Sequence, residues 1–323
     1  VGVVGANGKD GGVYISIDQG ATYTYRSVNP AVSVWNIEVT DLAIYAGTTQ
    51  GLAVSRDGGE TFVFYKATPD CRLLDDPCPD KPEYTSLTHN TISGITALGN
   101  SSIQLLATED GLAISENSGL SYSIFDSSLD GIADDSIHSV EYLGGDNLLI
   151  TNGSGVSLSS DFGKTWNFQE LGNWLTGSDY NNAVPELITI STEYFGVYIS
   201  KDKGQTFTHK TSAHGLLNNG VSSVAIANDG TIYVSHEDYL EEGAGVSFST
   251  DGGDSFTALP MFENDNILDS SDSASALDIL HVAVSDNGSV FLATMYGLYV
   301  SSDELATFTQ YLADQSILTS TLV

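Results

Sequence analysis

The octapeptide SRDGGETF at residues 55–62 indicates the fold, because the same pattern occurs seven times along the chain. Each copy reads Ser-x-Asp-x-Gly-x-Ser/Thr-aromatic, with two departures. Successive copies are 39, 60, 44, 41, 49 and 52 residues apart, which suits a repeat of one four-stranded β-sheet with its loops. The copies are SIDQGATY from Ser16, SRDGGETF from Ser55, SENSGLSY from Ser115, SSDFGKTW from Ser159, SKDKGQTF from Ser200, STDGGDSF from Ser249 and SSDELATF from Ser301.

Each octapeptide predicts a locked hairpin turn. The Asp carboxylate accepts hydrogen bonds from N–H groups of its own turn, the Gly supplies a backbone conformation that other residues resist, and the final aromatic packs between neighbouring sheets. In the third copy Asn replaces Asp and can still accept these bonds, whereas in the seventh Leu305 replaces Gly, which we expect to strain or reshape the turn. The Asp position holds, in order, Asp18, Asp57, Asn117, Asp161, Asp202, Asp251 and Asp303.

Short alternating segments surround every octapeptide and read as the other strands of a sheet. GLAVSRD is typical of the third strand, VFLATM of the second, SIHSVEYL of the innermost and TFVFYKA of the outermost. The prediction is an all-β fold, a single seven-bladed β-propeller domain over residues 1–323. The N-terminal VGVVGAN reads as a second strand and the C-terminal SILTSTLV as an innermost strand. We therefore expect the C-terminal strand to complete the first blade, which removes open sheet edges.

The seven octapeptides resemble the Asp-box, or BNR, repeat of sialidases and related propellers, and the resemblance covers the whole chain. It implies the propeller fold but not a function, because the motif occurs in enzymes, lectins, receptors and assembly factors. Sialidases clamp the sialic-acid carboxylate with three arginines. The only arginines here are Arg26, Arg56 and Arg72, and only Arg72 falls in a loop on the expected binding face. The resemblance thus implies a sialidase-like fold without the sialidase arginine triad.

The net charge of −32 restricts the partners. Nucleic acids are excluded as partners, because their binding requires a basic face, and anionic membrane surfaces are disfavoured for the same reason. Neutral, cationic or metal-bridged partners are favoured. Adaptation to salt is an alternative explanation, since an acidic surface keeps a protein soluble. No apolar run reaches the length of about 18 residues that a membrane span requires.

Cys71 and Cys78 are the only cysteines, and they flank a short acidic, proline-containing segment. They predict a disulfide that closes one surface loop, and hence an oxidising, extracellular or cell-surface location. Two free thiols, or half of a zinc site, are the alternatives, although no second ligand pair has suitable spacing. The chain starts at Val1 inside a strand pattern, so we expect a leader or a further domain to precede it in the complete protein.

The longest connections gather on the face opposite the octapeptides, at residues 66–91, 169–186, 235–244 and 259–278, and we expect the binding site there. Exposed aromatics can stack on sugar rings or bury in a partner surface, although they can equally pack within their own loops. The predicted ligand-binding residues are Trp174, Asp179, Tyr180, Tyr239 and Arg72.

The sequence has no cofactor motif, and Ca²⁺ is the metal ion that its acidic clusters favour, since carboxylates are hard oxygen ligands. No cluster has the spacing of a known calcium loop, and solvated surface acids are the alternative. The candidate calcium ligands are Glu237, Asp238, Glu241 and Glu242.

The leading interpretation is a secreted or cell-surface, non-catalytic recognition module. It would bind a protein or a glycan, as an adhesin does, within a larger extracellular protein or assembly. One alternative is a glycoside hydrolase or lyase that uses two carboxylates, with candidates Asp134, Asp135, Asp179, Glu237 and Asp238. Among 42 acidic residues such a pair arises easily by chance. The other alternative is a structural or assembly subunit.

Deletion of residues 315–323 tests the expected closure of the first blade. The truncated chain loses one complete inner strand, so its melting temperature and the cooperativity of unfolding should both fall, as calorimetry can measure. An unchanged melting temperature would rule out the closure.

Overall fold

The computed structural model describes residues 2–3, 11–17, 22–29, 33–67, 84–85, 87, 89–98, 102–128, 131–172, 174–237, 243–261, 278–294 and 297–311. Apart from one 3₁₀ turn at Ser212–His214, the regular structure in these ranges is β-strand, which confirms the all-β prediction. None of the described helical structure is long and apolar enough to span a membrane.

The described strands form seven antiparallel sheets in chain order. The first sheet contains β1 (Gly2–Val3), β2 (Gly11–Ile15) and β3 (Thr24–Asn29). The second contains β4 (Val34–Val39), β5 (Ile44–Thr48), β6 (Gly51–Ser55) and β7 (Val63–Ala67), with β8 (Tyr84–Thr85) paired parallel to β7. The third contains β9 (Ile92–Ala97), β10 (Gln104–Thr108), β11 (Gly111–Ser115) and β12 (Ser123–Phe125). The next two contain β13 (Ile137–Gly144), β14 (Asn147–Asn152), β15 (Gly155–Ser159) and β16 (Asn167–Glu170); and β17 (Leu175–Tyr180), β18 (Ile188–Thr192), β19 (Val197–Ser200) and β20 (Thr208–Lys210). The last two contain β21 (Val221–Ile226), β22 (Ile232–His236), β23 (Gly245–Ser249) and β24 (Thr257–Pro260); and β25 (Ile279–Val284), β26 (Val290–Thr294), β27 (Gly297–Ser301) and β28 (Thr309–Tyr311).

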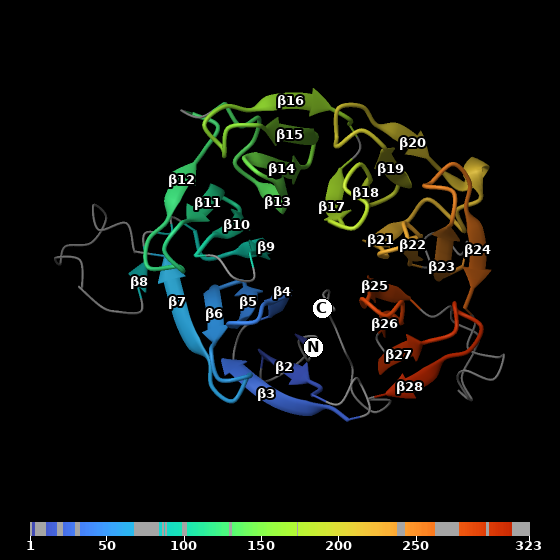
Figure 1. Cartoon of the computed structure of the whole chain (residues 1–323), viewed down its shortest axis with the longest axis horizontal. Helices are drawn as coiled ribbons and strands as arrows, with labels where there is room; N and C mark the ends of the chain where they lie inside the picture. The colour runs from blue at the N-terminus through green and yellow to red at the C-terminus, as the bar shows by residue number, and fades with distance from the viewer. Residues whose placement is uncertain are drawn as a thin grey trace.

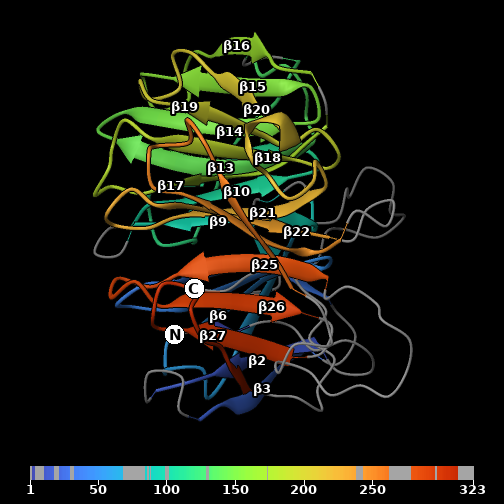
Figure 2. The same cartoon turned by 90° about the vertical axis from the view of Figure 1, so that its right-hand side faces the viewer.

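The sheets are arranged radially around one axis, which is a β-propeller (Figure 1). Strands β4, β9, β13, β17, β21 and β25 lie nearest the axis, and the fourth strands of the same six sheets lie towards the rim. From the side, inner strands such as β25 run along the axis (Figure 2). Six sheets are complete blades with four or five strands, one fewer than the seven we predicted, because the first sheet has only three described strands. The C-terminal segment that we expect to complete it, residues 312–323, lies outside the described residues.

The six octapeptides from Ser55 onward form the turns between the third and fourth strands of their sheets, as predicted. In the second copy, Ser55 Oγ donates to Asp57 Oδ1 at 2.8 Å and the Thr61 backbone N donates to the same oxygen at 2.9 Å. Thr61 Oγ1 donates to Asp57 Oδ2 at 2.5 Å, and the Gly59 N–H donates to Ser55 Oγ at 2.8 Å. The bonds from Thr61 and Ser55 lower the pKa of the exposed Asp57 carboxyl to about 2. The same bonds recur at Asp161, Asp202, Asp251 and Asp303, whereas Asp18 lies outside the described residues.

The two departing copies keep the same turn. Asn117 Oδ1 accepts from the Ser121 N–H at 3.0 Å, and its amide nitrogen donates to Ser121 Oγ at 2.8 Å, so an amide replaces the carboxylate as predicted. Leu305 adopts a φ of 68°, and its N–H still donates to Ser301 Oγ at 3.0 Å. The expected strain is therefore present, since a left-handed conformation is costly for a residue with a Cβ. Of the two expected effects, strain or reshaping, strain is the one observed, because the bonds of the turn hold Leu305 in place.

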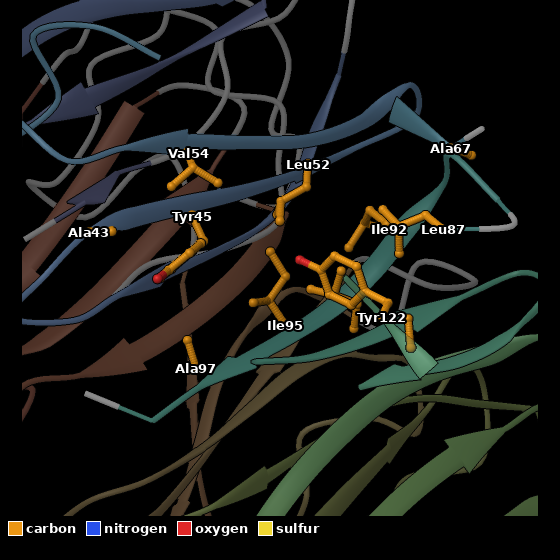
Figure 3. Close-up of a cluster of buried hydrophobic side chains, with 12 residues drawn as sticks. Ala43, Tyr45, Leu52, Val54, Ala67, Leu87, Ile92, Ile95, Ala97 and Tyr122 are labelled. Atoms are coloured by element: carbon orange, nitrogen blue, oxygen red, sulfur yellow. The ribbon is translucent and has the colours of Figure 1, made fainter. Parts of the chain in front are cut away.

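The aromatic residue that ends each octapeptide packs against the preceding sheet, as predicted. Tyr122 of the third sheet lies among Tyr45, Leu52 and Ile95, between the second and third sheets (Figure 3). Tyr23 of the first sheet packs with Leu298 and Val300 of the seventh, so this contact also joins the two ends of the series. The other members of the set are Phe62, Trp166, Phe207, Phe256 and Phe308.

Two adjacent glycines of the second turn differ in what an added side chain would contact. Both have positive φ, 74° at Gly58 and 88° at Gly59. A Cβ at Gly58 would meet nothing within 4 Å, but at Gly59 it would lie 1.9 Å from Ile15 Cδ1 of the neighbouring sheet. Gly58→Ala should cost about 1–2 kcal/mol through backbone strain alone, and Gly59→Ala should cost about 1–3 kcal/mol more through overpacking. Denaturant unfolding of both variants measures the difference, and equal losses would contradict it.

Candidate functional site

The inner strands enclose an axial cavity of about 880 Å³, which we call the channel. In each of the six inner strands a bulge follows the first residue, so the strands line the channel in one common register. The first residue of each strand is buried and apolar and anchors it to the core. These anchors are Val34, Ile92, Ile137, Leu175, Val221 and Ile279.

Side chains of one inner strand bond to the backbone of the next. The second residue of β9, β13 and β21 donates to the carbonyl oxygen of the first residue of the following inner strand. The inner strand is an edge strand with a paired neighbour on one side only. These side chains therefore satisfy backbone groups that the sheet leaves unpaired. The donors are Ser93, His138 and Ser222, and the acceptors are the carbonyls of Ile137, Leu175 and Ile279, respectively.

One end of the channel carries exposed aromatic rings. Trp35 and Trp174 both line the channel, and their exposed fractions are 50% and 63%. The φ of Trp174 is 34°, a strained value for a bulky residue, and such strain concentrates at functional sites. Because consecutive strands are antiparallel, this end shares its face with the long connections and lies opposite the octapeptide turns. The structure thus places Trp174 on the predicted binding face.

Two further aromatics lie beside Trp174. Tyr194 and Phe195 occupy the turn between β18 and β19 and are 41% and 44% exposed. The backbone N–H of Glu193 donates to the Trp174 carbonyl at 3.2 Å, which ties this turn to the mouth of the channel. Neither these two residues nor Trp35 is among the predicted binding residues. For Tyr194 and Phe195 the sequence signal is a bulky aromatic in a short turn, where no core contact requires one.

Asp179 and Tyr180 lie on the inner strand β17, so their prediction as loop residues is wrong. β17 has the sequence LTGSDY, which is rich in polar residues because the strand borders a polar channel. Asp179 Oδ2 accepts from the Ile226 N–H at 2.6 Å, and burial raises the pKa of Asp179 to about 7. Tyr180 packs beside the Leu143 cluster, and its hydroxyl donates to the Leu143 carbonyl at 3.4 Å. Tyr180 is thus chiefly a packing residue.

Asp179 belongs to a layer of three carboxylates, which we call the acidic layer. Glu38, Glu141 and Asp179 are each the fifth residue of their inner strands, β4, β13 and β17. Glu141 accepts from Ser178 Oγ at 2.9 Å. Burial, followed by the charges of Asp179 and Glu38, raises the pKa of Glu141 well above its usual range. Burial also raises the pKa of Glu38 to about 8, against the effect of a hydrogen bond from Ala97.

Several predicted site residues fall outside the described ranges. These are Arg72, Tyr239, the cysteines Cys71 and Cys78, and the candidate calcium ligands Asp238, Glu241 and Glu242. Glu237 is described, and partial burial followed by the charges of Asp278 and Glu193 raises its pKa. In the described part of the chain, no three His, Cys, Asp or Glu side chains are grouped to hold a metal ion. The calcium site stays a prediction.

Two other candidate carboxylates have turn-stabilising roles. Asp134 Oδ1 accepts from the Ser136 N–H at 3.0 Å, and Asp135 Oδ1 accepts from the Ser127 N–H at 2.6 Å. Neither residue lines the channel. The described structure therefore does not bring them together with Asp179.

Searches with the sequence match no protein family and no curated protein. Among solved structures, YCF48 bound to a D1 peptide aligns with a TM-score of 0.62 at 17% identity, over 89% of this chain and 83% of that one. The GH74 xyloglucanase from Xanthomonas campestris aligns with a TM-score of 0.60 at 16% identity, over 91% of this chain and 47% of that one. PorZ, a surface component of the type-IX secretion system of Porphyromonas gingivalis, aligns with 0.58 at 15% identity, over 96% and 38%. These similarities establish the β-propeller fold, and the chain spans less than half of the last two proteins.

The raised pKa of Asp179 predicts a pH dependence of stability. Its folded-state pKa of about 7 exceeds the ordinary value of 3.8, so between these pH values the folded protein binds more protons than the unfolded chain. The free energy of unfolding should therefore fall as pH rises from 4 to 7, by at most about 1.4 kcal/mol per pKa unit. Asp179→Asn keeps an acceptor for Ile226 and should flatten this slope in urea unfolding at a series of pH values.

Asp57→Asn is the control for this experiment. The pKa of Asp57 is lowered to about 2, so Asp57 is ionised in both the folded and the unfolded state above about pH 5. Its substitution should leave the slope above that pH unchanged. An Asp179→Asn slope equal to that of the unmodified protein would contradict the assignment.

Proposed function

We propose that this propeller is a non-catalytic recognition module, secreted or on a cell surface, that binds a segment of a partner protein at the mouth of its channel. The observation that carries the proposal is the channel itself. It combines exposed indole rings at one end with a polar wall inside. Interface residues that contribute most to affinity are typically such aromatics beside a pocket.

The charge of the channel favours a protein segment over a glycan. The described lining includes Glu38, Glu141 and Asp179 but no lysine or arginine. These carboxyls have raised pKa values in the free protein. The ammonium and guanidinium groups of a protein segment would stabilise their ionised form, whereas a neutral glycan carries no charge that could do so. The solved YCF48 propeller was captured with a peptide, which is a precedent for this use of the fold.

A carboxylate-dependent glycosidase is the second candidate, and one observation favours it. Asp179 and Glu141 are neighbours in the channel, and burial raises the pKa of both. Paired carboxyls with separated pKa values can provide a general acid and a general base. Against it, each of the two already accepts a hydrogen bond from the propeller wall, which gives both a structural role.

We also propose that the chain is an Asp-box propeller of seven blades, closed by the C-terminal strand in the first blade. Three observations support this proposal. The first sheet has three described strands where the others have four or five, its side chains pack against the seventh sheet, and six described octapeptides share one bonding pattern. The extracellular location and the Cys71–Cys78 bridge belong to the same proposal, with PorZ as a surface-protein precedent for the fold.

A binding experiment with two tryptophan variants tests the recognition function. The full chain is immobilised and offered a random peptide library and a glycan array. Trp35→Ala and Trp174→Ala should each reduce peptide retention by about tenfold, an effect of about 1.4 kcal/mol that is typical of an anchor residue. Leu120→Ala is the control, because Leu120 is 82% exposed and lies in an octapeptide turn on the opposite face.

The same samples are assayed for release of reducing ends from polysaccharides. Hydrolysis that Glu141→Gln abolishes would replace the recognition function by the glycosidase. Retention of glycans but not of peptides would overturn the choice of a protein partner. Peptide retention that neither tryptophan variant reduces would overturn the placement of the site.

A further inference from the structure

The acidic layer lies below the aromatic mouth, within reach of a long side chain. Trp35 and Glu38 are three residues apart on β4, which is about 10 Å along a strand. A segment held at the tryptophans can therefore place a side chain of the length of lysine or arginine down the channel. Shorter side chains would stop above the layer.

The channel wall has an excess of hydrogen-bond acceptors, and not only through its charges. Asn36 Oδ1 is a buried atom of the lining, and in the described part of the chain it has no hydrogen-bond partner. An unmet buried acceptor destabilises the folded protein, and a donor that enters the channel would satisfy it.

The carboxylates keep acceptor sites beyond their structural bonds. Ile226 occupies Oδ2 of Asp179 and Ser178 occupies Oε1 of Glu141. A bound cation lowers the raised pKa values of these carboxyls and so favours the ionised form, which offers about four acceptor sites. The grouping does not suit a metal ion in the described structure. A guanidinium or ammonium group is a better match, since it satisfies several acceptors by hydrogen bonds over a wider spacing.

We infer that the channel is a receptor for one cationic side chain, lysine or arginine, of the bound protein segment, which Glu38, Glu141 and Asp179 hold together with Asn36. The inference rests on the proposed recognition function and names the residue class that the site selects. The tryptophans hold the backbone of the segment at the mouth, and the acidic layer binds one of its side chains.

Four synthetic peptide libraries test this selectivity on the immobilised full chain. Each has random positions around one fixed central residue, which is arginine, lysine, citrulline or acetyl-lysine. Citrulline preserves the length of arginine, acetyl-lysine keeps the lysine stem and adds an acetyl group, and both remove the charge. The arginine or lysine library should be retained about tenfold better than its neutral counterpart, as befits a partly desolvated charge pair.

The triple variant Glu38→Gln, Glu141→Gln and Asp179→Asn should abolish that difference, because each amide keeps an acceptor for its structural bond but removes the charge. The control variant is Glu109→Gln, Asp110→Asn and Glu170→Gln, three exposed acids outside the channel. Both variants change the formal net charge, which counts every carboxyl as ionised, from −32 to −29. The control should retain the preference, which separates the channel from the general field of the protein.

The outcomes distinguish the inference from the function on which it rests. Equal retention of all four libraries by the unmodified protein overturns the inference and leaves peptide recognition in place. Retention of none overturns both. An unchanged preference in the folded triple variant also overturns the inference, and where that variant does not fold, Asp179→Asn alone must reduce the preference.

Discussion

The unpaired edge of each inner strand is the constraint on which the site depends. A propeller gathers six described strand edges around one axis, and the N–H and C=O groups of these edges need partners. Side chains of the preceding strand supply them, as Ser93 does for the carbonyl of Ile137 and Asp179 for the N–H of Ile226. The polar residues of the channel therefore have a structural role in the fold, independent of any ligand.

This dual role explains how acids come to lie inside the fold. A carboxylate can satisfy a backbone N–H and retain acceptor sites for a further donor. The cost is desolvation, which is the main reason why the pKa values of Glu38 and Asp179 are raised. A serine or threonine in the same place satisfies the edge without that cost, as Thr96 does for the carbonyl of Val140. The fold alone therefore does not require acidic residues at these positions.

The fold could be predicted from the sequence because its turns are encoded locally. The residues of one octapeptide make nearly all the bonds of their own turn, so the pattern identifies the structure without knowledge of distant contacts. The site could not be predicted in the same way. β17 reads as a loop because a strand that faces a polar channel has no apolar periodicity, and the acidic layer appears only when β4, β13 and β17 are placed in register. The long connections that carry Arg72 and Tyr239 lie outside the described residues.

The packing of Tyr23 against Leu298 and Val300 means that no sheet of the series has only one neighbour. In linear repeat proteins the terminal repeats have a single interface, and unfolding proceeds inward from them. Here the removal of any one sheet breaks two apolar interfaces at once. Amide hydrogen exchange should therefore report similar protection for the central strands of every sheet, instead of a gradient from the chain ends to the middle.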